Sequence, residues 1–79
     1  MSAPRDVLEY IARGIVDEPE AVQVTETEDG GMVTLHLTVA GDDLGKVIGR
    51  HGRTARAIRS LVRVAGMSSG VDTRVEILE

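Results

Sequence analysis

The spacing of apolar residues changes along this 79-residue chain, and this change constrains the fold more than any other feature. Residues 4–16 place apolar side chains at helical intervals, whereas residues 21–28 and 32–40 alternate apolar and polar side chains. Helical spacing returns after residue 42, and alternation returns at residues 71–77. The pattern therefore predicts the order helix, strand, strand, helix, helix, strand.

Residues that favour helix ends and turns divide these segments. Ser2 is suited to cap the first helix, Pro4 is tolerated in its first turn, and Asp17-Glu18-Pro19 should end it. Asp29-Gly30-Gly31 supplies the positive backbone angles of a tight hairpin between the two strands. The first half should thus be a helix followed by an antiparallel pair.

The second half should contain two helices joined by a glycine-rich turn. Asp42 is expected to cap a short helix through Ile48, which Gly49 should end in the left-handed conformation. A longer helix is expected from Arg53 to Ala65, and Gly66–Gly70 should be a loop. Two helices between strands give enough chain for a crossover into parallel pairing. We therefore predict one α+β domain over residues 1–79, a three-stranded mixed sheet with three helices on one face.

The charge of the chain is distributed unevenly. The net charge is −4, but residues 1–43 carry ten acids and two arginines, a balance of −8. Residues 44–71 carry one lysine, five arginines and no acid. Because a polyanion responds to the local field and not to the total, this basic block is compatible with a nucleic-acid partner.

Composition excludes several classes of protein. A chain without cysteine has neither disulfides nor thiolate metal ligands, and no cluster of other ligand types suggests a metal or a cofactor. Charged residues interrupt the N-terminal segment before a signal-peptide core forms, and no apolar stretch could span a membrane. No pair of nucleophile and base is evident, so we expect a non-catalytic, cytoplasmic protein.

The segment Gly45–Gly52, GKVIGRHG, can be compared with three known glycine-rich motifs. A phosphate-binding P-loop fails because Gly41 to Gly45-Lys46 is one residue short and Val47 replaces the hydroxyl that would hold magnesium. A dinucleotide fingerprint fails because a helix, not a strand, precedes the glycines. A Gly-x-x-Gly turn between two helices, Gly49–Gly52, fits.

Residues 47–58, VIGRHGRTARAI, resemble the signature of KH domains, and the predicted element order is that of their type II, bacterial form. The resemblance extends over the whole chain to the small single-KH-domain bacterial proteins of the KhpA type. Ala55 departs from the KH pattern, in which many members carry a larger aliphatic residue. This departure leaves the shape of the groove and the base preference open.

The resemblance implies single-stranded RNA as the ligand, clamped by its backbone at the Gly-x-x-Gly turn. Glycines let the main chain approach phosphates, and the following helix directs its amino end to the same place. Bases would lie over a groove floored by apolar residues, with the third strand and the loop at 66–70 opposite. The expected RNA-binding residues are Lys46, Val47, Ile48, Gly49, Arg50, His51, Gly52, Arg53, Arg56 and Ile58.

Some polar residues have simpler roles. We expect Arg59 and Arg63, further along the same helix, to pair with acids of the first helix. His36 is expected to be a surface residue, and Asp42 and Asp43 are expected to serve the start of a helix and not acid–base catalysis. With Tyr10 as its only aromatic residue, the chain lacks the stacking platform of RRM-like or cold-shock-like domains.

The resemblance also implies protein partners: a second copy of the chain, and a larger KH protein of the KhpB (Jag/EloR) type. Such proteins act as RNA chaperones or post-transcriptional regulators in pathways that touch cell shape and small RNAs. The alternative function is a KH-fold protein-interaction subunit with little direct RNA binding.

Overall fold

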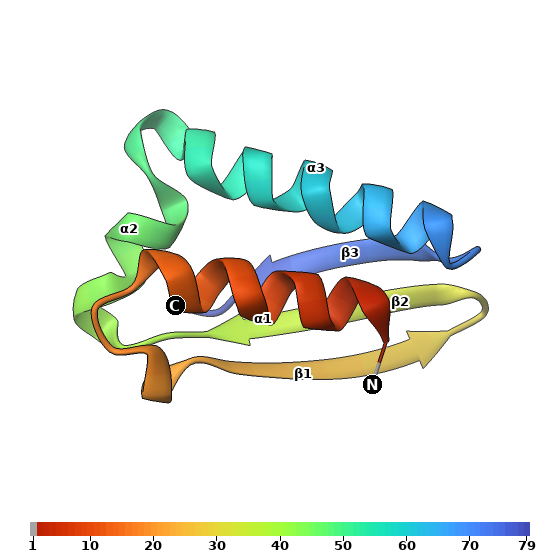
Figure 1. Cartoon of the computed structure of the whole chain (residues 1–79), viewed down its shortest axis with the longest axis horizontal. Helices are drawn as coiled ribbons and strands as arrows, with labels where there is room; N and C mark the ends of the chain where they lie inside the picture. The colour runs from red at the N-terminus through yellow and green to blue at the C-terminus, as the bar shows by residue number, and fades with distance from the viewer. Residues whose placement is uncertain (1) are drawn as a thin grey trace.

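The computed structural model describes residues 2–79, which form three α-helices and three strands in the predicted order (Figure 1). Single 3-10 turns at Pro19–Ala21, Gly41–Asp43 and Arg50–Gly52 join them. The main elements are α1 (Ala3–Ile15), β1 (Gln23–Asp29), β2 (Met32–Thr38), α2 (Leu44–Ile48), α3 (Arg53–Ser68) and β3 (Asp72–Ile77).

The sheet has the order β1-β2-β3 and is mixed, as predicted. β1 and β2 pair antiparallel with Val24 opposite Leu37, and β2 and β3 pair parallel with Leu35 opposite Val75. The helices lie on one side of this sheet, with α1 and α3 next to each other and α2 at one end (Figure 1). The α+β architecture with two layers is therefore confirmed.

The core lies between the sheet and the helices. Apolar residues from one face of each strand meet the apolar stripes of the helices, since strand side chains alternate between faces and helical ones recur every third or fourth residue. The buried cluster consists of Leu8, Ala12, Val16, Val22, Val24, Val33, Leu35, Leu37, Val47, Ile58, Val62 and Val75. The opposite face of the sheet is polar, and His36 there pairs with Glu76, Nε2 to Oε1, at 3.0 Å.

The predicted caps and turns of the first half are confirmed. The Ser2 hydroxyl accepts a hydrogen bond from the Arg5 backbone N–H at 3.2 Å, and α1 ends at Ile15, just before the predicted breaking residues. Gly30 and Gly31 have φ angles of 60° and 86°, which are the positive values that the hairpin requires.

The start of α2 differs from the prediction. Asp42 lies in the 3-10 turn, and Asp43 occupies the N-cap without capping the helix through its side chain. The Asp43 carboxylate is directed elsewhere, as described below. Gly49 does end α2, with its N–H donating to the Gly45 carbonyl at 2.8 Å, but its ψ of 170° places it outside the left-handed helical region.

The predicted loop at 66–70 is also wrong, because α3 continues to Ser68. Gly66 is helical and buried, and Gly70 follows the end of the helix with a φ of 76°. The Val71 N–H donates to the Gly66 carbonyl at 2.9 Å, and the Gly70 N–H donates to the Met67 carbonyl at 3.1 Å. These two bonds form a Schellman motif, so Gly70 and not Gly66 is the terminating glycine.

Candidate nucleic-acid interface

The turn between α2 and α3 has a backbone that only glycine adopts easily. Gly49 has φ 75° and ψ 170°, and Gly52 has φ 72° and ψ 13°. A Cβ on Gly49 would overlap the Thr54 hydroxyl oxygen and lie 2.6 Å from Thr54 Cβ. Both the dihedral angles and this close contact therefore require glycine at position 49.

His51, between the two glycines, also has left-handed backbone angles, φ 56° and ψ 24°. This conformation is uncommon for a residue with a Cβ, and such residues cluster at ligand-binding sites. The side chains of Arg50 and His51 are exposed, and the turn projects at the end of the molecule between α2 and α3 (Figure 1). The turn therefore presents two basic side chains outward and does not pack into the interior.

The amino end of α3 adds a favourable field for an anion next to this turn. Gly52 is the N-cap residue and has no side chain to accept hydrogen bonds from the first helical amides. The aligned peptide dipoles of the 16-residue helix place partial positive charge there. The turn and the helix start thus combine backbone donors with side-chain cations.

Most cations of the basic block have no acidic partner. Arg50, Arg53 and Arg56 are exposed, and within residues 2–79 no carboxylate lies within 4.0 Å of their guanidinium groups. Because these charges are not neutralised within the protein, they are available to phosphate oxygens.

Lys46 differs from these arginines because it already has acidic partners. Its ammonium group pairs with the Asp17 carboxylate and lies 3.8 Å from Asp43 Oδ1. The hydrogen bond to Asp17 raises the pKa of Lys46 above its ordinary value of 10.5. Partial desolvation lowers the pKa by less than this hydrogen bond raises it, and attraction to the Asp17 and Asp43 carboxylates raises it further. A phosphate would have to compete with Asp17 for this lysine.

Asp43 ties α2 to a distant part of the chain. The residue is 1% exposed, and its two carboxylate oxygens accept hydrogen bonds from the Asp17 and Glu18 backbone N–H groups, each at 3.1 Å. These amides follow the end of α1 and have no helical partner. Sequence reasoning missed this role, because an acid before a helix is normally a cap.

The expected apolar groove is mostly covered. Val47 is fully buried and Ile58 is 2% exposed, so both side chains belong to the core beneath the turn. Ile48 is partly exposed and is the residue of the three that reaches the surface. The aliphatic floor visible to a ligand is therefore smaller than expected, and Val47 and Ile58 join α2 and α3 to the core.

Arg59 and Arg63 do not pair with acids of α1, contrary to expectation. They line a hollow of about 300 Å³ between α3 and β3, together with Met32, Thr73, Arg74 and Val75. Arg59 Nε donates a hydrogen bond to the Val75 carbonyl at 3.3 Å. Arg74 was not among the expected binding residues, because its position in an alternating strand indicates a surface side chain and no particular ligand.

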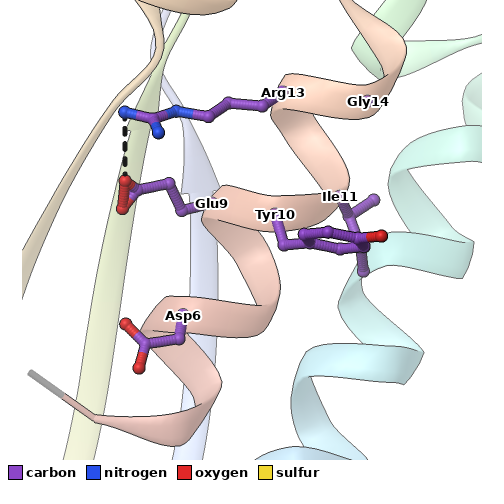
Figure 2. A pocket seen from close by; sticks show the side chains of 6 residues that line it. All are labelled: Asp6, Glu9, Tyr10, Ile11, Arg13 and Gly14. Atoms are coloured by element: carbon purple, nitrogen blue, oxygen red, sulfur yellow. Dashed lines mark ion pairs between the residues drawn. The ribbon is translucent and has the colours of Figure 1, made fainter.

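A second hollow, of about 610 Å³, lies along α1 (Figure 2). Its lining residues are Asp6, Glu9, Tyr10, Ile11, Arg13 and Gly14. Arg13 pairs with Glu9 at 3.3 Å, so the positive charge on this wall is neutralised. With two carboxylates and one paired arginine, the hollow is unsuited to a polyanion.

Neither a metal cluster nor a membrane-spanning helix is found in the described part of the chain. Within residues 2–79, no three His, Asp or Glu residues come together in a way that could hold a metal ion. None of the helices in the same range has both the length and the apolar character that crossing a bilayer requires. The turn and its basic surroundings remain the best-supported candidate site.

Comparison with known proteins identifies the family. A model described as "KhpA/KhpB, KH domain" matches residues 5–77. Two curated proteins named "RNA-binding protein KhpA" are each 43% identical to the chain. One, from Treponema pallidum (strain Nichols), aligns over 94% of this chain and 92% of its own length; the other, from Aquifex aeolicus (strain VF5), aligns over 100% of both.

Solved structures support the fold. Era bound to MgGDPNP and nucleotides 1506–1542 of 16S ribosomal RNA is similar over 94% of this chain, with a TM-score of 0.65 and 16% identity. Aquifex aeolicus Era bound to GDP and aluminium fluoride has the same TM-score. This chain spans 28% and 29% of those two Era chains, respectively. The family match and the relatives together show that the chain belongs to the KhpA/KhpB family of KH domains.

Proposed function

We propose that this protein binds single-stranded RNA without catalysis, gripping the ribose-phosphate backbone at the turn Gly49–Gly52. One observation carries the proposal: an outward-facing turn with glycine-type angles, two exposed basic side chains and the amino end of α3 beside it. Backbone amides approach phosphates closely where no Cβ intervenes. A KH turn of this kind clamps about four nucleotides.

The expected binding residues have three different roles in this proposal. Contact with the RNA strand is assigned to Ile48, Gly49, Arg50, His51, Gly52, Arg53 and Arg56. Val47 and Ile58 support the turn from the core, where their side chains are buried. Lys46 contacts a phosphate only after it leaves Asp17.

The relatives support a binding module over an enzyme. Proteins about 40% identical to this chain over nearly its whole length are named as RNA-binding proteins. A cytoplasmic role as an RNA chaperone or post-transcriptional regulator is consistent with such binding.

A double charge reversal at the turn tests the RNA site. Arg50→Asp with His51→Asp should abolish binding of a short single-stranded RNA, measured by fluorescence anisotropy, and should leave the circular dichroism spectrum unchanged. For the wild type, about three phosphate contacts predict that log K falls with log salt at a slope of about −2. Arg13→Asp, an exposed change on α1, is the control and should bind like the wild type. Unchanged binding by the folded double variant would refute the proposal.

We further propose that the protein works as a homodimer and as a heterodimer with a KhpB (Jag/EloR)-type KH protein. The outer surface of the two long helices supports this proposal, because Tyr10 is 82%, Leu61 54% and Val64 60% exposed. Exposed apolar side chains grouped on two adjacent helices, unlike single ones, mark a candidate protein-protein contact.

The same surface favours a second candidate function, a KH-fold subunit that binds proteins and little RNA. Crosslinking in cells followed by RNA sequencing separates the two. Abundant crosslinks that depend on Arg50 and His51 would support the RNA-binding function. A salt-resistant protein complex together with negligible crosslinking would support the interaction subunit.

A further inference from the structure

The hollow between α3 and β3 brings together three arginines from two elements. Arg59 and Arg63 come from α3, and Arg74 comes from β3. Met32, Thr73 and Val75 complete the lining of the space of about 300 Å³. Three arginines that line one hollow concentrate positive charge there, and this favours an anion.

The charges of this arginine hollow are not neutralised by the protein. Within residues 2–79, no carboxylate lies within 4.0 Å of the three guanidinium groups. Glu76, two residues after Arg74, pairs with His36. Arg59 uses its Nε for the Val75 carbonyl, which fixes the side chain over β3 and leaves its terminal nitrogens without a protein acceptor. The hollow therefore carries positive charge that an anion could neutralise, with Arg59 already held in place.

A continuous basic flank connects the hollow to the turn. At 100° per residue, Arg56, Arg59 and Arg63 lie on one flank of α3, and this flank begins beside Arg53 at the turn. With a rise of about 1.5 Å per residue, the distance from Arg53 to Arg63 along the helix is about 15 Å. A stacked strand with about 3.4 Å per phosphate covers that distance in about four nucleotides.

We infer that the arginine hollow holds a further phosphate of the same RNA strand, beyond the nucleotides gripped at the turn. The inference rests on the proposed RNA-binding function and extends it. The footprint of one protein chain is then longer than the four nucleotides of the turn alone. Affinity should rise with RNA length past four nucleotides, until the strand reaches the hollow.

The test is a length series of single-stranded RNA, from about 4 to about 12 nucleotides, measured by anisotropy or by competition. Arg63→Gln with Arg74→Gln removes two charges and leaves the Arg59–Val75 hydrogen bond in place. This variant should bind the shortest RNA like the wild type. For the longest RNA it should bind about tenfold or more weakly at about 0.1 M salt, with a salt slope shallower by about 0.7 because one phosphate contact is lost.

Two controls distinguish the loss of an arginine at the hollow from the loss of an arginine elsewhere, and the loss of charge from the loss of the guanidinium group. Arg63→Gln alone should weaken binding of the long RNA, whereas Arg13→Gln, the matched loss of one exposed arginine on α1, should not. Arg63→Lys with Arg74→Lys should keep most of the salt slope. Equal affinities of the double Gln variant and the wild type for every RNA length would overturn the second site alone. Failure of the wild type to bind any RNA would overturn the proposed function and this inference with it.

Discussion

Gly49 and Gly52 look equivalent in the sequence, but the structure gives them different constraints. Gly49 lies in a region of backbone angles that is essentially restricted to glycine, and its missing side chain makes room for Thr54. Gly52 is in the left-handed helical region with no atom within 4 Å of an added Cβ. The turn should therefore tolerate a side chain at one glycine much better than at the other.

Gly49→Ala should reduce the free energy of unfolding by about 2–3 kcal/mol, because strained angles and overlap with Thr54 add together. Gly52→Ala should cost about 1 kcal/mol, the penalty of the left-handed conformation alone. Urea denaturation of both variants measures the difference. Equal losses would show that the Thr54 contact does not constrain the turn.

The pair of Lys46 and Asp17 should make stability depend on alkaline pH. Because the folded-state pKa of Lys46 is raised, the contribution of the pair is complete below the ordinary value of 10.5 and is lost as pH rises through the folded value. Asp17→Asn removes the main partner and should flatten this loss. Urea midpoints at about pH 9 and about pH 11 for both proteins test it, and parallel curves would contradict the expectation.

At the scale of elements, α3 and β3 are packed more closely than the sequence suggests. A Cβ on Gly66 would lie 2.5 Å from Thr73 Cγ2 and 3.0 Å from the Val71 carbonyl oxygen. An alanine in a helix is favoured over glycine by about 1 kcal/mol, but overpacking costs about 1–3 kcal/mol. The close approach of the strand therefore explains a glycine inside the helix.

Gly66→Ala should consequently destabilise the protein by about 1 kcal/mol despite its better helix propensity. Thr73→Ser removes the methyl group that the new side chain would meet. The double variant should be more stable, by about 0.5–1 kcal/mol, than the sum of the two single changes predicts. Additive losses in a urea double-mutant cycle would place the clash at the Val71 backbone instead.

The type and order of the elements could be predicted, because each helix or strand buries one face. The spacing of its apolar residues along the sequence therefore shows which kind of element it is. Two details depended on contacts between distant residues. On sequence alone, either Gly66 or Gly70 could end the helix. In the structure Gly66 lies inside the helix, where it packs against Thr73. Of the adjacent acids Asp42 and Asp43, only the second has partners in the α1–β1 connection.

The candidate site could be predicted in part. The glycine spacing indicated the turn, and the structure brings Arg50, His51 and Arg53 together around it. Pattern reasoning did not show that Lys46 is engaged by Asp17. It also did not show that Arg74 lies near Arg59 and Arg63, because only the tertiary arrangement puts that strand beside α3.

On the scale of the whole molecule, the arginines of α3 and the exposed apolar side chains lie on different surfaces. The arginines of α3 flank the turn and the hollow, whereas acids gather on α1 beside Tyr10. Leu61 and Val64 are exposed on α3 but lie on a different flank of the helix from Arg59 and Arg63. RNA and a protein partner could then bind at the same time.

In the proposed homodimer, Leu61→Glu should weaken self-association by about tenfold or more, because it would place a charge in an apolar contact. Since Leu61 is 54% exposed, the free energy of unfolding of the monomer should change by less than about 0.5 kcal/mol. Leu78→Glu, at a site 47% exposed, is the matched control and should leave association intact. Sedimentation equilibrium measures both, and identical behaviour of the two variants would exclude this surface.

The hydrogen bonds of Asp43 have a consequence for engineering. The segment that carries the glycine turn is contiguous in sequence, but its first helix is anchored by amides 25 and 26 positions earlier. Transplanting residues 44–58 into another scaffold would leave that anchor behind. The recipient would need its own pair of free amides, and a matching buried carboxylate, before the grafted segment could hold its shape.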